Sequence, residues 1–233
     1  MDAICREELY QPGALELIAE AERHIIVKPD TKVLSVGCGS GELECYFAAK
    51  FNCTVHGIDN AADSIRHASE KAVKKSIADR TRFSVCDGRA TNFSINAFDL
   101  VLCSGGWAGD LVQLGRFVQE SHRILKTDGK VVLITTVWTR EDVPDQVKNM
   151  WAKGGAIFHP SEVEGFFQNH QFGVEFSRIA DEPIWWQNWC NDMQMTKAYS
   201  LNSTDPSIWK NIHRQYHESR GCIGLGLFIL RRL

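Results

Sequence analysis

Three glycines separated by single residues, Gly37, Gly39 and Gly41, stand where the sequence changes from a strand-like run to a helix-like run. Residues 32–36 before them are mostly apolar, and residues 42–49 after them are mostly helix formers. Glycine lets a ligand approach the backbone closely, and the unpaired N–H groups at a helix start can donate hydrogen bonds to it. The stretch therefore predicts a loop that binds a nucleotide-like ligand.

The spacing of these glycines separates the possible ligand classes. A dinucleotide fingerprint, G-x-G-x-x-G/A, requires Gly or Ala where this chain has Glu42. A carboxylate is a poor neighbour for a pyrophosphate, and no Gly-Lys-Ser/Thr of a P-loop follows. The loop therefore fits neither type of phosphate site.

Two acidic residues follow later strand-like runs. Residues 54–58 lead to Asp59, eighteen positions beyond Gly41, and residues 82–86 lead to Asp87 and Gly88. The carboxyl ends of parallel strands meet at one edge of a sheet, where Asp59 could accept hydrogen bonds from both hydroxyls of a ribose. The alternatives are a helix cap at Asp59 and an ordinary Asp-Gly turn at Asp87.

With these acids in place, the run V-L-S-V-G-C-G-S-G resembles motif I of the class I S-adenosylmethionine-dependent methyltransferases. F-D-L-V at 98–101 resembles the opening of that family's fourth strand, and K-T-D-G at 126–129 resembles its L-K-P-G-G turn. The resemblance covers about residues 10–180. The tail beyond it is similar to small-molecule methyltransferases of the ubiquinone-biosynthesis-like group.

The resemblance implies S-adenosyl-L-methionine as the cofactor, and we expect no metal because the cysteines and histidines form no cluster with metal-ligand spacing. It implies that Asp87 accepts a hydrogen bond from the adenine amino group. The residues expected to bind the cofactor are Gly37, Cys38, Gly39, Gly41, Asp59, Asn60, Asp87, Gly88, Cys103 and Ser104. One position departs from the family, because Ser35 replaces the acid that usually precedes the glycines. Serine can form a hydrogen bond but brings no charge, so cofactor affinity could be reduced, or Glu42 could compensate.

The implied reaction is an in-line displacement that moves the methyl group to an N, O or C atom of a small molecule. A general base is required only if that atom carries a proton at the working pH. His159 is the candidate base, with Tyr10 as a second candidate catalytic residue, and each could instead have a purely structural role. The substrate is expected to contact aromatic side chains at the same edge: Trp107, Trp138, Trp185 and Trp189. Each tryptophan could equally belong to the core.

The alternation of strand-like and helix-like segments predicts an α/β fold with a doubly wound sheet. The resemblance implies a Rossmann-like methyltransferase fold with seven mostly parallel strands, of which the last is antiparallel. The expected strands are 32–36, 54–59, 82–86, 98–103, 130–137, 172–179 and 222–230, and the expected helices are 14–26, 42–49, 64–76, 111–125, 144–151 and 160–169. We expect a single domain, 1–233, with an N-terminal cap helix region (1–28) and a substrate-covering insertion (181–221) before the last strand.

Composition narrows the functional classes. The chain has 233 residues, 44% of them hydrophobic and 24% charged, which is ordinary for one globular domain. A formal charge of −3 disfavours nucleic acid as a substrate, and no apolar run reaches a membrane-spanning length. The eight scattered cysteines and a start without signal-peptide character predict a cytoplasmic protein with reduced thiols. We expect a small-molecule substrate, no membrane partner, and a monomer or homodimer.

Two alternatives to a small-molecule methyltransferase stay open from the sequence. The first is a non-catalytic member of the fold that binds a cofactor or a partner protein, suggested by Ser35. The second is a methyltransferase that acts on a peptide or RNA.

Overall fold

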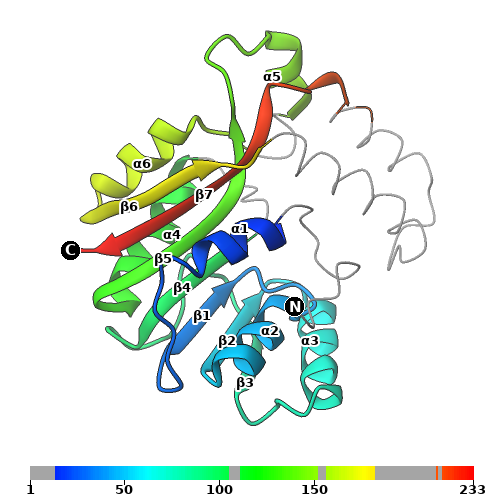
Figure 1. Cartoon of the computed structure of the whole chain (residues 1–233), viewed down its shortest axis with the longest axis vertical. Coiled ribbons are helices and arrows are strands. Elements are labelled where there is room, and N and C mark those ends of the chain that lie inside the picture. Colours follow the sequence, from blue (N-terminus) through cyan, green and yellow to red (C-terminus); the bar gives the residue numbers. More distant parts are fainter. Residues whose placement is uncertain (1–13, 105–110, 152–155, 182–213, 215–216) are drawn as a thin grey trace.

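The computed structural model describes residues 14–104, 111–151, 156–181, 214 and 217–233 (Figure 1). Seven strands form one sheet in the order β3-β2-β1-β4-β5-β7-β6. The strands are β1 (Lys32–Val36), β2 (Thr54–Asp59), β3 (Thr81–Val85), β4 (Phe98–Ser104), β5 (Leu125–Trp138), β6 (Phe172–Ile179) and β7 (Ile223–Arg232). The helices are α1 (Ala14–Ala21), α2 (Glu42–Phe51), α3 (Ala62–Lys74), α4 (Leu111–Ile124), α5 (Asp145–Trp151) and α6 (Pro160–Gln168).

The first five strands pair in parallel, and β7 runs antiparallel to both β5 and β6. This confirms the predicted fold class and the antiparallel last strand. The strand order reverses between β1 and β4, so the connections that leave β1 and β4 diverge there. A crevice beyond the carboxyl ends of the strands at such a point is the usual ligand site of this architecture.

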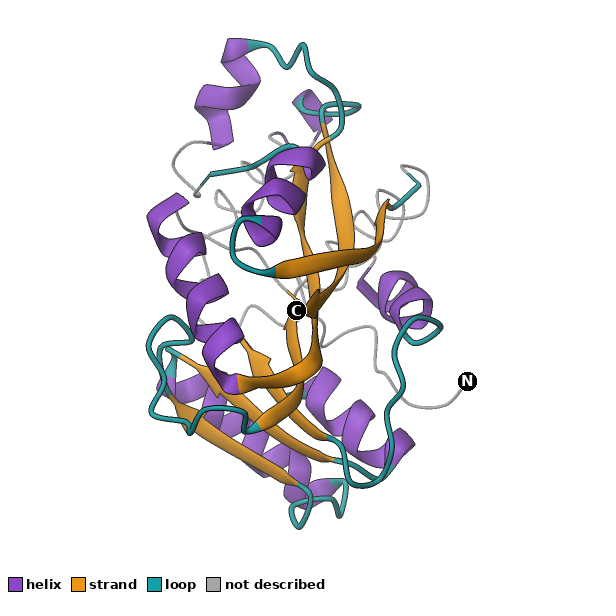
Figure 2. Ribbon diagram, turned by 90° about the vertical axis from the view of Figure 1, so that its left-hand side faces the viewer, coloured by secondary structure: helices purple, strands orange, loops and turns teal. Residues whose placement is uncertain are grey.

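Helices cover both faces of the sheet (Figure 2). One core cluster joins apolar residues of α1, α2 and α3 to one face, and a second joins those of α4 and α6 to the other. Val33 and Leu34, neighbours in the central strand β1, are 1% and 0% exposed and belong to the two opposite clusters. Their burial on both sides of the sheet explains why the central strands read as nearly continuous apolar runs.

Two predicted elements differ from those observed. The first helix ends at Ala21 instead of extending to residue 26, and Ile26 is 82% exposed. The expected turn at 126–129 lies inside β5, where the pairing with β4 shifts between Phe98 and Leu100. Asp128 has a φ of 61°, so the extra residues form a bulge in the strand.

Several expected site residues lie outside the described part of the chain. They are Tyr10, Trp107, Trp185 and Trp189, together with most of the insertion at 181–221 and the first half of the cap region. Among the described helices, none is long and apolar enough to cross a membrane.

Candidate functional site

The glycine loop after β1 is held by backbone hydrogen bonds to the end of β2. The N–H groups of Gly37 and Cys38 both donate to the carbonyl oxygen of Ile58, at 2.8 and 3.0 Å. Gly37, Gly39 and Gly41 have φ values of 74°, 52° and 79°, which L-residues with a side chain rarely adopt. Three left-handed residues at alternate positions turn the chain sharply from β1 into α2, which explains why the sequence has glycine there.

The surroundings of the three glycines differ. Apart from the chain neighbours of each glycine, no described residue lies within 4 Å of a Cβ built on Gly37 or Gly39, so the described part of the chain leaves the backbone open at both positions. A Cβ on Gly41 would lie 2.6 Å from the Cβ of Ala68 in α3. Gly41 therefore lets α2 and α3 pack closely, whereas Gly37 and Gly39 leave room for a ligand against the main chain.

Asp59, the last residue of β2, connects this loop to the start of α3. Its Oδ2 accepts a hydrogen bond from the Gly39 N–H at 3.0 Å, and its Oδ1 accepts one from the Ala61 N–H at 2.8 Å. Each carboxylate oxygen retains a second lone pair, so Asp59 can still accept hydrogen bonds from ligand hydroxyls. The geometry of Asp59 therefore allows it both to hold the glycine loop in place and to accept hydrogen bonds from ligand hydroxyls.

Asp87 and Gly88 lie beyond β3 at the same edge. A Cβ on Gly88 would lie 2.2 Å from Cγ1 of Val36, so only glycine allows this loop to cross the end of β1. The Asp87 carboxylate accepts hydrogen bonds from Nε and Nη2 of Arg89 at 2.8 and 2.7 Å, and from the Arg89 N–H at 2.9 Å. The hydrogen bond from the Arg89 side chain is the main reason that the pKa of Asp87 lies below its usual value.

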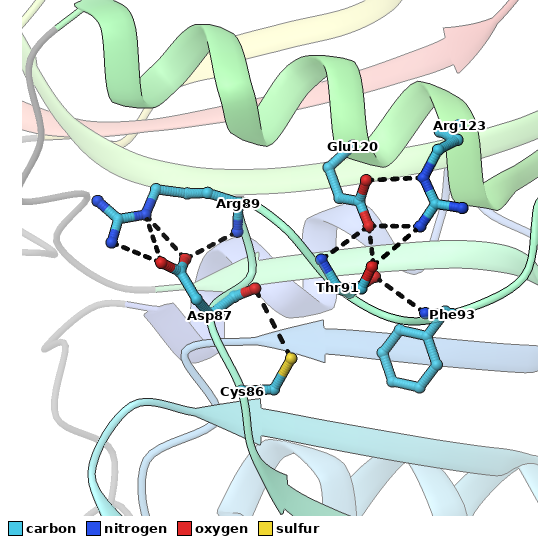
Figure 3. Close-up of polar contacts among 7 residues, drawn as sticks. All are labelled: Cys86, Asp87, Arg89, Thr91, Phe93, Glu120 and Arg123. Atoms are coloured by element: carbon cyan, nitrogen blue, oxygen red, sulfur yellow. Dashed lines mark hydrogen bonds and ion pairs between the residues drawn. The ribbon is translucent and has the colours of Figure 1, made fainter.

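The loop that carries Asp87 is fastened to α4 by Glu120, as Figure 3 shows. Oε1 of Glu120 accepts the Thr91 N–H at 2.9 Å and also the Thr91 hydroxyl, and Arg123 donates to both carboxylate oxygens. Burial alone would raise the pKa of Glu120, but these donors together lower it. Arg89 adds a second connection, because its Nη1 donates to Oε1 of Gln113 on α4 at 2.6 Å.

Ser35 is paired with a buried acid that the sequence analysis did not select. Ser35 is 2% exposed, and its hydroxyl forms a hydrogen bond with the carboxyl group of Glu44, which is 1% exposed. Burial raises the pKa of Glu44 to about 7. Glu44 also acts on the neighbouring Cys38, because its charge adds to burial in raising the pKa of that thiol.

Glu42, the acid that could compensate for Ser35, has its partners on another helix. Its carboxylate turns towards α3, where Oε1 and Oε2 pair with Lys75 at 2.7 Å and Lys71 at 3.1 Å. Lys71 also donates to the Ser40 hydroxyl at 3.3 Å. Glu42 therefore fastens α2 to α3, and Lys71 connects the glycine loop to the same helix.

The remaining predicted cofactor residues lie at the same edge. Cys38 and Cys103 are 8% and 4% exposed, and burial is the largest cause that raises the pKa of both thiols, to about 12 for Cys103. Ser104 ends β4 in a half-buried position, and Asn60 is exposed after Asp59. The structure thus brings the predicted cofactor set together, although these thiols are not acidic. Among the described residues, no cluster of His, Cys, Asp and Glu could hold a metal ion.

Two predicted acceptor-side residues have clear structural roles. His159 is the N-cap of α6, where its N–H donates to Oε2 of Glu162 at 2.6 Å, and its Nε2 lies 4.0 Å from Oε2 of Glu141. Trp138 is 7% exposed and packs in a core cluster that includes Ile223. The structural alternative considered for each residue is thus present in the fold.

The carboxyl end of β5 is joined to the segment that enters β7. The Thr139 N–H donates to the carbonyl oxygen of Cys222 at 3.0 Å, and the Trp151 indole N–H donates to the hydroxyl of Ser219 at 2.7 Å. Ser219 has no exposed surface. The antiparallel direction of β7 therefore brings the end of the 181–221 segment to the edge where β1 to β5 end.

Sequence reasoning missed Glu44, Arg89 and Glu120. Glu44 could have been noticed as an acid in the first turn of the helix that follows the glycines. The contacts of Arg89 with Gln113 and of Glu120 with Thr91 gave no such signal, because each joins two different elements.

The chain is similar to methyltransferases both in sequence and in fold. Residues 33–129 match the family described as a methyltransferase domain. Phosphoethanolamine N-methyltransferase 1 of Arabidopsis thaliana is 37% identical over 89 residues, which are 38% of this chain and 18% of that protein. Chloroplastic tocopherol O-methyltransferase of the same plant is 32% identical over 106 residues, or 45% of this chain and 30% of that one. The chain thus spans less than a third of the length of these relatives.

Among solved structures, geranyl diphosphate C-methyltransferase from Streptomyces coelicolor A3(2) superposes with a TM-score of 0.74 and 20% identity. The match covers 94% of this chain and 79% of that one. That structure holds Mg²⁺, geranyl diphosphate and S-adenosyl-L-homocysteine. At this identity the likeness concerns the fold.

Proposed function

We propose that this chain, which has the fold of the class I S-adenosylmethionine-dependent methyltransferases and a methyltransferase domain at residues 33–129, transfers a methyl group to a small molecule. The observation that carries the proposal is the open backbone at Gly37 and Gly39 beside the Asp59 carboxylate. A nucleoside can lie against that backbone and give its hydroxyls to Asp59. The names of the matched relatives support a small acceptor, since each describes a methyltransferase of a small molecule.

The residues of this edge fit S-adenosyl-L-methionine. Asp59 would accept from the ribose, Asp87 from the adenine amino group, and the loop at 37–41 would border the rest. The cofactor's sulfonium supplies an activated methyl group, so the protein mainly orients the acceptor in line with it and excludes water. Gly88 fits this arrangement, because the close crossing over Val36 keeps the Asp87 loop at the end of β1.

The residues proposed to contact the methyl acceptor are those that the sequence predicts. His159 stays the proposed base and Tyr10 the second candidate, with Trp107, Trp138, Trp185 and Trp189 as proposed substrate contacts. The helix-capping position of His159 and the burial of Trp138 favour structural roles for these two. The displacement needs a base only for a protonated acceptor, so the proposed transfer does not depend on His159.

The experiment is isothermal titration of the full chain with S-adenosyl-L-homocysteine, followed by titration of Asp59→Ala. We expect the variant to bind one to two orders of magnitude more weakly, roughly the effect of losing a charged acceptor for two hydroxyls. Asp99→Ala is the matched control, because Asp99 also accepts a backbone N–H, that of Lys32 at 2.8 Å, but at the opposite end of the sheet. Absence of binding at millimolar ligand would refute the cofactor assignment.

Methyl transfer is tested separately, with labelled S-adenosyl-L-methionine and a panel of amines, phenols and prenyl-type acceptors. Transfer to a panel member identifies the acceptor atom. Tight cofactor binding without transfer to any of them would favour the non-catalytic alternative.

A further inference from the structure

We propose that Glu44 is a positioning residue for the cofactor, supplying from α2 the negative charge that Ser35 lacks and giving up its proton when the cofactor binds. The inference rests on the proposed cofactor site and assigns a role there to a residue outside the glycine loop. Glu44 would act on the cofactor through the glycine loop and through its own negative charge beneath that loop.

The position of Glu44 follows from the turn that the glycines make. Gly41 is the N-cap of α2, so Glu44 is the third residue of the helix, and its side chain also accepts a hydrogen bond from its own backbone N–H. The carboxyl group therefore lies at the N-terminal end of α2, where the helix dipole favours a negative charge. Cys38 of the loop is close enough to both Glu44 and Asp59 for both charges to affect its thiol.

The carboxyl group of Glu44 is incompletely satisfied. One contact is the hydrogen bond with Ser35, but Oε2 is buried and has no hydrogen-bond partner among the described residues. A buried polar atom without a partner costs free energy, so a cation or donor that arrives nearby is favoured. A ligand on the open backbone of Gly37 and Gly39 would bring such a charge, because S-adenosyl ligands carry an ammonium group.

Burial is the main cause of the raised pKa of Glu44, and the charges around it have smaller, opposing effects. Glu42 on the same helix raises its pKa, and Lys71 on α3 lowers it. Lys71 also pairs with Glu42, which has Lys75 as a second partner, so the lysines mainly neutralise Glu42. The thiols of Cys38 and Cys45 are the other titratable groups of the described residues that interact with Glu44, and burial keeps both of them neutral near pH 7.

Thermodynamic linkage between proton binding and ligand binding fixes the sign of the pH dependence, and its size follows from the pKa change on binding. Ionised Glu44 attracts the ammonium group that both S-adenosyl ligands carry, and by reciprocity the bound ligand lowers the pKa of Glu44 by the same factor. If binding lowers that pKa by about one unit, from about 7 to about 6, affinity rises about fivefold from pH 6 to pH 8. At pH 7 binding would release roughly 0.4 proton to the buffer.

The test is titration with S-adenosyl-L-homocysteine at pH 6, 7 and 8, in two buffers with different enthalpies of ionisation. We expect proton release near pH 7 from the wild-type chain, and Glu44→Gln to bind about tenfold more weakly at pH 8 with that release lost. Glu42→Gln is the matched control, a buried acid of the same helical turn. The Glu42→Gln chain should still release protons on binding. The midpoint of its pH dependence should lie at lower pH, because the negative charge of Glu42 no longer raises the pKa of Glu44.

Ser35→Ala keeps the inference testable if Glu44→Gln does not fold. Removal of the hydroxyl takes away a hydrogen bond that lowers the pKa of Glu44, so the midpoint of the affinity change should move to higher pH. Wild-type binding that is independent of pH and buffer would overturn the role of Glu44 and leave the proposed cofactor site intact. Absence of any binding would overturn both.

Discussion

Alanine substitutions at Gly39 and Gly41 separate the two roles of the glycine loop. Each substitution places a side chain at positive φ, which costs about 1 kcal/mol. At Gly41 the new Cβ would also lie 2.6 Å from the Cβ of Ala68 and 3.1 Å from the ring of Phe83. Relieving such overlap in a packed interior costs about 1–3 kcal/mol more. We therefore expect a stability loss of about 1 kcal/mol for Gly39→Ala and about 2–4 kcal/mol for Gly41→Ala.

The effect on ligand binding should run in the opposite order. A methyl group on Gly39 enters the space that the proposed cofactor occupies, so Gly39→Ala should weaken S-adenosyl-L-homocysteine binding at least about tenfold. Urea unfolding followed by circular dichroism measures stability, and titration calorimetry measures binding. The double variant Gly41→Ala, Ala68→Gly is the control for overlap, because it should recover stability relative to Gly41→Ala alone. Equal stability losses, or unchanged binding in Gly39→Ala, would refute this division of roles.

Three other variants test the electrostatic contacts of the site. Because the pKa of Glu44 rises from 4.5 in the unfolded reference to about 7, its contribution favours folding at low pH and is lost as pH increases between those values. Glu44→Gln should remove this loss of stability, which amounts to about 3 kcal/mol. The free energies of unfolding measured with urea at pH 5 and pH 8 should then differ less than in the wild-type chain. Glu120→Ala should lower the free energy of unfolding by about 2–4 kcal/mol, because it leaves the buried Thr91 donors unpaired; a change below 0.5 kcal/mol would contradict the contacts seen here. Arg89→Ala should raise the pKa of Asp87 towards its ordinary value, which a carboxyl carbon NMR titration measures, and an unchanged value would mean that the ion pair is absent in solution.

The sequence by itself determined the order and type of the elements. Alternation of short apolar runs with helix-forming segments is local information, so the strand ranges of the parallel sheet could be predicted closely. The glycine loop was equally readable, because positive φ at alternate positions requires glycine whatever surrounds it. Asp59 could be placed beside the loop because parallel strands end at one edge of the sheet.

Only the tertiary structure decided which acid accompanies Ser35. Residues two apart on an α-helix point about 200° apart, so Glu42 faces the lysines of α3 while Glu44 faces β1. The orientation of α2 depends on its contacts with other elements, among them the close approach of Gly41 to Ala68 and the burial of Leu43, Cys45, Phe47 and Ala48 in the core. The same reason hid the contacts of Arg89 with Gln113 and of Glu120 with Thr91, because both depend on how the loop after β3 packs against α4.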